Sequence, residues 1–310
     1  MIVAVAVTPI SIVTGGVGGA LMLTPTAPSG LAVAQSDTGP SLTWTDNSSN
    51  ESGFYVQRSP TGAGTWTTVA TKAANATSHI DTTAVSGTAY DYRIQAFITG
   101  QGTANSNTVS FTWWAPVQDS FTYTDTDITG ATPDVLNNGN TWTSAQLGGG
   151  ASRLNTNGTV VYNGSTTGSP FAKISVGTPD GKITYTGALR GSAAGSIQHR
   201  GYLRYIDDDN LWVVVWSRND GSGTVRLYEF TTAGGAIDKG SYVAGTAGTA
   251  EIIFEATAAD AFNVTIGGTL RIGPISDTSN NTGIIAGVGV TDSGSTAGTT
   301  NVTSWRWEPV

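Results

Sequence analysis

The chain contains no cysteine in its 310 residues, which excludes a disulfide framework and a zinc site built from thiolates. Charged side chains are scarce: Asp, Glu, Lys and Arg make up 12% of the sequence, and the formal net charge is -8. Because the few basic residues form no cluster, nucleic acid and anionic membrane surfaces are poor expected partners. Few stretches show a 3.6-residue apolar period, so the sequence gives little support for helices.

Alternation of apolar and polar residues is common along the chain, and glycine is abundant, with 41 residues. Short alternating runs separated by turn-forming residues are typical of β-strands. A chain of this length is also long enough for two domains. The sequence therefore predicts an all-β protein with two domains.

The clearest motif consists of strand-like segments around residues 42–59 and 87–96. Leu42 and Trp44 alternate before a polar turn, and a second strand starts at Phe54. Further along, the two-residue period of a strand places four apolar side chains on one face, those of Tyr90, Tyr92, Ile94 and Ala96.

Together these segments resemble the B–C and F strands of a fibronectin type III domain of the bacterial or phage kind, covering residues 28–113. Tyr90 stands where a tyrosine corner would tie strand F to the preceding loop. The resemblance implies a β-sandwich of the type used as a spacer or adhesive module. Another antiparallel sandwich is the alternative, because sandwich architectures share these patterns.

Residues 1–27 precede this domain and carry no charged side chain. A secretory signal needs a positively charged n-region, which this segment lacks. A membrane span needs about 20 uninterrupted apolar residues, and Thr8-Pro9 and the glycines of 15–19 interrupt this segment. The segment Ile2 to Val7 is apolar and β-forming, and such a strand aggregates unless it is paired. We expect an extended arm that anchors the chain, through residues 1–26, to partner subunits in a homo-oligomeric assembly. An atypical signal or a disordered tail is the alternative.

Pro116 marks a break after the first domain, so residues 114–118 are predicted to be a linker. The second domain, 119–310, shows about nine alternating segments at the turn-rich spacing of a jelly-roll sandwich. They are 182–189, 201–206, 211–217, 224–230, 251–256, 262–266, 270–272, 283–290 and 302–308.

Three stretches of this domain resemble concanavalin-like or laminin-G-like jelly rolls. The opening residues 119–122, with 132–134 and Trp142, resemble the first strand and loop of such domains in phage structural proteins. Residues 201–212 resemble the family's central hairpin, and 283–290 with 304–307 resemble its closing strands. The resemblance implies a two-sheet sandwich and allows calcium at loop rims.

The acidic residues do not match a glycosidase, which needs two carboxylates at a defined separation. Among the five glutamates, Glu251 and Glu255 share a strand face, but four residues along a strand is about 13 Å, too far for a retaining pair. The two histidines, His79 and His199, lie in different domains. The sequence therefore predicts that the protein is not an enzyme.

Sugar binding is a candidate activity of the second domain. Trp212 and Trp216 share one face of the strand 211–217, and Tyr202 and Tyr228 could join them in a platform on which a sugar ring stacks. Because both faces of this strand are apolar, it is expected to be central in its sheet. The alternative is that the two tryptophans belong to the core.

One turn is a candidate calcium site, since Asp207, Asp208, Asp209 and Asn210 offer a concentration of oxygen ligands. The alternative is a polar hairpin turn, in which Asp and Asn are favoured for backbone reasons. No other cofactor is expected.

These features favour a non-enzymatic bacteriophage virion structural protein, either a capsid decoration, a head fibre or a tail-associated subunit. Such a protein would lie on the virion surface and present adhesive domains to host-surface glycan. The alternative is a secreted bacterial carbohydrate-binding or adhesion protein. A polysaccharide hydrolase is disfavoured, because the required carboxylate pair is missing.

Overall fold

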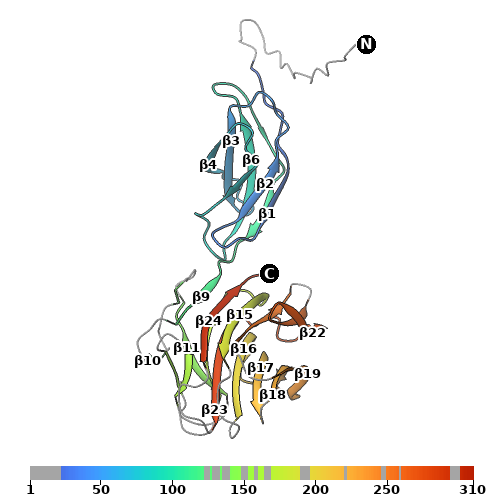
Figure 1. The fold of residues 1–310 in the computed structure, drawn as a ribbon. Helices are drawn as coiled ribbons and strands as arrows, with labels where there is room; N and C mark the ends of the chain where they lie inside the picture. The colour runs from blue at the N-terminus through green and yellow to red at the C-terminus, as the bar shows by residue number, and fades with distance from the viewer. Residues whose placement is uncertain are drawn as a thin grey trace. The chain divides into compact units, whose positions relative to one another are not determined.

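The protein was analysed as a computed structural model, which describes residues 22–121, 126–127, 133–134, 140–147, 153–156, 160–163, 169–188, 196–219, 222–245, 249–257, 260–293 and 301–310. The predicted arm falls largely on residues 1–21, which lie outside the described residues. The chain divides into two compact units, the first ending at Trp113 and the second running from Trp114 to Val310 (Figure 1). The described segments contain no helix long and apolar enough to cross a membrane.

The first unit is built from two antiparallel sheets. Its strands are β1 (Ser29–Ala34), β2 (Ser41–Thr45), β3 (Gly53–Pro60), β4 (Thr67–Ala73), β5 (Ser78–Ile80), β6 (Ala89–Phe97), β7 (Thr103–Asn105) and β8 (Val109–Thr112). One sheet has the order β1-β2-β5, and the other has the order β4-β3-β6-β7, with β8 pairing β6. This is the strand arrangement of a fibronectin type III sandwich.

The core of the first unit lies between these sheets, as the alternation predicts. Buried apolar side chains come from β2, β3 and β6, and the Trp44 and Phe54 ring centroids are 5.9 Å apart. Tyr92, Ile94 and Ala96 are fully buried on one face of β6, and the partly buried Tyr90 packs against the same cluster.

The tyrosine that ties β6 to a loop is Tyr92, and the expectation for Tyr90 was wrong. The Tyr92 hydroxyl donates a hydrogen bond to Asp81, 3.0 Å away, and Arg58 pairs with the same carboxylate at 2.7 Å. Tyr90 instead lies beneath the Arg58 guanidinium, 4.4 Å from ring centroid to Cζ. The two tyrosines share a face, but only Tyr92 lies deep enough to reach the buried Asp81.

Replacing Asp81 is expected to destabilise the first unit. Asp81→Asn removes the charge that compensates the partly buried Arg58, and leaving one partner of a buried ion pair alone typically costs about 3–5 kcal/mol. Tyr92→Phe removes a single hydrogen bond and should cost about 1 kcal/mol. Urea unfolding of the full chain, monitored on the first unit's transition, measures both. Equal effects of the two substitutions would contradict the central role of Asp81.

The second unit is also formed by antiparallel strands. They are β9 (Val117–Asp119), β10 (Thr126–Asp127), β11 (Thr143–Leu147), β12 (Arg153–Thr156), β13 (Val160–Asn163), β14 (Ser169–Ser175), β15 (Gly181–Ala188), β16 (Ser196–Asp207), β17 (Asn210–Asn219), β18 (Ser222–Thr231), β19 (Gly235–Gly245), β20 (Thr249–Ala256), β21 (Ala261–Ile266), β22 (Thr269–Ser276), β23 (Ile285–Ser293) and β24 (Asn301–Glu308).

Within the described residues these strands form two sheets. The nine-stranded sheet has the order β10-β12-β13-β24-β15-β20-β21-β22, with β9 pairing β24. The seven-stranded sheet has the order β11-β14-β23-β16-β17-β18-β19. The main core cluster draws residues from both sheets, so it lies between them. The unit is therefore a concanavalin-like jelly-roll sandwich.

The predicted segments of the second domain coincide with strands of these sheets, and β17 lies in the interior of its sheet, between β16 and β18. The strands β10 to β14 and β19 were not predicted. The sequence of β19 is interrupted by glycines and serine, and Gly240 lies beside an irregularity in its pairing with β18. Pairing with β18, rather than a local apolar pattern, makes this segment a strand.

The segment predicted as a linker is packed into the second unit. Trp114 packs against the main core, and Ala115 and Val117 are buried. Val117 begins β9, and Asp119 at the end of this strand accepts hydrogen bonds from the backbone N–H of Phe121 at 2.7 Å and from the indole of Trp142 at 2.5 Å. Residues 114–118 therefore serve as the opening of the sandwich.

Candidate functional site

Trp212 and Trp216, two of the proposed sugar-stacking residues, lie in the core. Trp212 is fully buried, and its ring stacks on Phe262 with centroids 3.7 Å apart and planes 14° apart. The Trp216 and His199 rings are nearly perpendicular, with centroids 5.6 Å apart, and Trp216 is 4% exposed. Neither indole offers a ring face to a sugar. Both tryptophans are therefore core residues, which was the alternative interpretation of the sequence.

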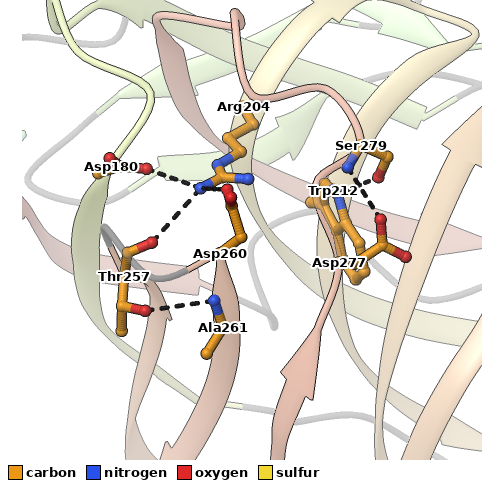
Figure 2. Close-up of polar contacts among 8 residues, drawn as sticks. All are labelled: Asp180, Arg204, Trp212, Thr257, Asp260, Ala261, Asp277 and Ser279. Atoms are coloured by element: carbon orange, nitrogen blue, oxygen red, sulfur yellow. Dashed lines mark hydrogen bonds and ion pairs between the residues drawn. The ribbon is translucent and has the colours of Figure 1, made fainter.

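A cation lies over each outer ring of this stack. The Arg204 guanidinium is 4.9 Å from the Phe262 centroid, and Lys239 Nζ is 5.5 Å from the Trp212 centroid. Figure 2 shows Arg204 between two carboxylates, with Asp180 at 2.6 Å and Asp260 at 2.9 Å. The stack therefore runs from Arg204 through the Phe262 and Trp212 rings to Lys239, and the two carboxylates neutralise Arg204.

Carboxylates also neutralise the other end of the stack. Lys239 pairs with the buried Glu229 at 2.7 Å and with Asp277 at 2.8 Å. The same Asp277 accepts a hydrogen bond from the Ser279 backbone, and the Ser279 hydroxyl accepts one from the Trp212 indole (Figure 2). Lys239 holds the pKa of Asp277 below its usual value by hydrogen bonding and charge, against the opposing effect of burial. Internal pairing of these groups makes the cluster structural.

The other two proposed residues, Tyr202 and Tyr228, lie on the opposite face of the seven-stranded sheet. A separate apolar cluster there is drawn from that sheet alone: Phe171, Tyr202, Tyr205, Leu211, Val213 and Val215, with Tyr228, Phe230 and Ile285 packed against it. Tyr202 is fully buried and stacks on Phe171 at 4.5 Å, whereas Tyr228 is only partly buried. Of the four proposed residues, Tyr228 alone presents part of its side chain to solvent.

A polar relay borders this outer-face cluster. The Lys173 ammonium donates to the Tyr205 hydroxyl at 3.2 Å, and that hydroxyl donates to Asp208 at 2.6 Å. Lys173 Nζ also lies 4.4 Å from the Tyr205 ring centroid. Burial, together with the hydrogen bond to Asp208, raises the pKa of Tyr205. The relay therefore keeps a neutral phenol between a cation and an anion.

A pocket of about 330 Å³ lies beside the relay and shares Lys173 with it. The pocket is lined by Asn140, Thr141, Thr143, Lys173, Ile174, Ser175 and Ile285. Hydroxyl, amide and ammonium groups in a pocket are the kind of polar groups that recognise a hydroxyl-rich ligand. We refer to the pocket, the relay and Tyr228 together as the outer-face site. Sequence reasoning missed Lys173 and Tyr205, because they lie on β14 and β16, strands far apart in the sequence that only the sheet brings together on either side of β23.

The turn proposed as a calcium site is a hydrogen-bonded hairpin turn. Asp207 accepts from the Asp209 backbone at 3.0 Å and from the Asn210 side chain at 2.8 Å. Asp208 is engaged by Tyr205. Within the described part of the chain, no group of three or more His, Cys, Asp or Glu side chains could hold a metal. These contacts favour the polar-turn alternative.

Most of the glutamates hold structural partners. Glu51 accepts from the Asn75 backbone, Glu229 pairs with Lys239, Glu255 accepts from the Asn263 amide, and Glu308 pairs with Lys182 and Arg306. A glycosidase carboxylate must instead face a substrate cleft.

No protein-family model matches the chain, and no curated protein matches it. A solved Fn3-like protein from Clostridium thermocellum is similar at 27% identity and a TM-score of 0.26, covering 29% of this chain and 93% of its own. The metal-free carbohydrate recognition domain of Emp46p is similar at 11% identity and a TM-score of 0.37, covering 54% and 87%. A native glycosidic hydrolase is similar at 11% identity and a TM-score of 0.40, covering 63% and 96%.

Proposed function

We propose that the second unit binds carbohydrate, without cleaving it, at the outer-face site. The observation that carries the proposal is the Lys173–Tyr205–Asp208 relay beside a pocket of about 330 Å³. The relay holds donors and acceptors in fixed positions, which lowers the entropic cost of binding a hydroxyl-rich ligand. The partly exposed Tyr228 lies on the same sheet face and supplies an aromatic surface.

The wider proposal is that the chain is a non-enzymatic adhesive protein of a bacteriophage virion, displayed as a homo-oligomer on the particle surface. The low charge and the phage-like opening of residues 119–134 support this assignment. The uncharged, apolar residues 1–26 would pair with other virion proteins as an anchor. Many displayed copies would convert weak individual binding to host glycan into strong avidity.

The first test of this function is Lys173→Gln in the full chain. The substitution removes the ammonium shared by the relay and the pocket, and we expect at least a tenfold weaker affinity for the bound glycan. Calorimetric titration against oligosaccharides of host-surface type measures the change. Lys182→Gln is the matched control, because Lys182 pairs with Glu308 on the nine-stranded sheet.

Two outcomes would contradict the proposal. Unchanged affinity of Lys173→Gln relative to Lys182→Gln would remove the outer-face site from glycan binding. Sustained release of reducing ends from a bound polysaccharide would contradict the non-catalytic assignment.

A further inference from the structure

The first unit carries an exposed stripe of flat side chains that runs across its five-stranded sheet. On the face opposite the core, Tyr55 and Gln57 project from β3, and Arg93, Gln95 and Phe97 project from β6, each partly exposed. The partly exposed Trp66 precedes β4, and the exposed Asn105 ends β7. The aromatic stripe is defined as Tyr55, Gln57, Trp66, Arg93, Gln95, Phe97 and Asn105.

Contacts within the aromatic stripe hold these side chains in place. The Arg93 guanidinium lies 4.2 Å from the Trp66 ring centroid, and its Nε donates to Gln57 at 2.8 Å. Tyr55 and Phe97 are stacked, with centroids 4.2 Å apart and planes 12° apart. Each ring is thus fixed by a neighbour, which reduces the conformational entropy that a ligand would have to remove.

The amides continue the aromatic stripe toward the sheet edge. Gln95 Nε2 donates to Asn105 Oδ1 at 2.9 Å, and Gln57 Nε2 donates to Thr68 at 3.4 Å. Gln95 and Asn105 share one hydrogen bond and Gln57 makes two, so each amide keeps further donor or acceptor capacity for a ligand. The arrangement alternates ring faces with oriented polar groups across the neighbouring strands β3, β6 and β7, with Trp66 just before β4.

A glycine supports one end of the aromatic stripe. Gly53 starts β3, and a Cβ added there would lie 3.2 Å from the Phe97 ring and 2.3 Å from the Lys72 carbonyl oxygen. The bare backbone at this position lets the Phe97 ring lie close to the strand. Phe97 is then placed to stack with Tyr55.

We propose that the aromatic stripe is a second carbohydrate-binding surface, one that takes an extended polysaccharide chain along the sheet. The aromatic stripe consists of rings, amides and one guanidinium, and the adjoining carboxylate on this face of β6, that of Asp91, accepts hydrogen bonds from the Gly62 backbone and the Ser110 hydroxyl. Such a surface matches the CH face and the hydroxyls of a sugar better than the aliphatic side chains of a protein partner. The inference rests on the proposed function only for the class of ligand, carbohydrate. The surface itself lies on the first unit, whereas the outer-face site lies on the second.

Retention of the full chain on immobilised polysaccharides tests the proposal. The probes are β-1,3-glucan, β-1,4-glucan, xylan, α-mannan and polygalacturonate, each measured by affinity electrophoresis. We expect Trp66→Ala and Tyr55→Ala each to weaken retention on at least one polymer by tenfold or more, since stacking residues dominate such contacts. Val85→Ala, which alters an exposed apolar residue of the same unit, should leave retention unchanged.

A variant counts as a report on binding only if the melting transition of the first unit shifts little. Trp66→Phe should restore part of the retention, because it preserves a ring.

Parallel measurement of Lys173→Gln separates this proposal from the outer-face site. Loss of retention in Lys173→Gln alone overturns the aromatic stripe and leaves the proposed function standing. Loss only in the Trp66 and Tyr55 variants supports the aromatic stripe and contradicts the outer-face site. No retention on any polymer, or self-association that Trp66→Ala abolishes, overturns the aromatic stripe as a glycan surface.

Discussion

Trp212→Ala is expected to destabilise the second unit by about 3–5 kcal/mol, the usual cost of removing a large aromatic side chain from a core. Trp212 is fully buried, and its ring joins the two sheets because Phe262, on which it stacks, belongs to β21 of the opposite sheet. Truncation would leave a cavity and would also remove the ring over which Lys239 is placed. We expect a clear drop in the melting temperature of the second unit.

Calorimetry of the full chain measures this effect, with the two units treated as separate transitions because a multidomain chain does not unfold in two states. Tyr228→Ala is the matched control, since Tyr228 is an aromatic residue of the same sheet that is only partly buried. We expect the Tyr228 variant to lose much less stability. A Trp212 variant of nearly normal stability that failed to bind glycan would instead make Trp212 a ligand-binding residue.

The second large expected effect is a loss of second-unit stability between pH 7 and pH 5, caused by His199. Burial lowers the pKa of His199 to about 3 from an ordinary value of 6.5, and within the described residues neither ring nitrogen has a hydrogen-bond partner. The folded state therefore keeps the imidazole neutral, while the unfolded chain binds a proton below about pH 6.5. The stabilisation present above pH 6.5 is lost progressively as the pH falls toward 3.

The expected size of this loss is about 2 kcal/mol at pH 5, because each pKa unit corresponds to about 1.4 kcal/mol. His79, the chain's other histidine, lies in the first unit. The carboxylates of Asp277 and Glu308 have lowered pKa values and titrate at more acidic pH. The slope between pH 7 and pH 5 in the second unit therefore reports His199.

Urea unfolding of the wild type and of His199→Leu at several pH values checks this result. We expect the leucine variant, of similar size and without a titrating group, to show a nearly flat dependence between pH 7 and pH 5. His79→Gln should leave the second unit's slope unchanged. An equal slope in wild type and His199→Leu would show that His199 is not the group responsible.

Much of the architecture could be predicted from alternation alone. The two-residue period placed Leu42 and Trp44 on one buried face and identified β17 as a central strand, because both of its faces are apolar. Glycine and proline positions indicated most of the turns. The prediction missed β10 to β14 and also β19, where glycines interrupt the pattern and pairing with β18 forms the strand.

The placement of functional groups depended on contacts between distant residues. Alternation shows that Trp212 and Trp216 share a face, but not that this face is the one covered by the other sheet. Alternation likewise places Tyr90 and Tyr92 on one face. Only the position of the buried Asp81, in a separate loop, decides that Tyr92 is the tyrosine that hydrogen-bonds to it.

The sequence by itself determined the all-β class, the two-domain division and the residues that share each strand face, since these depend on local periodicity and turn chemistry. The tertiary structure alone decided which faces are closed and which stay open. It buried Trp212 and Trp216 in the second unit and joined Lys173 to Tyr205 across strands, and it left the rings of Tyr55 and Trp66 partly exposed on the first unit. The physical reason is that exposure depends on what packs against a face, and that partner can lie anywhere along the chain.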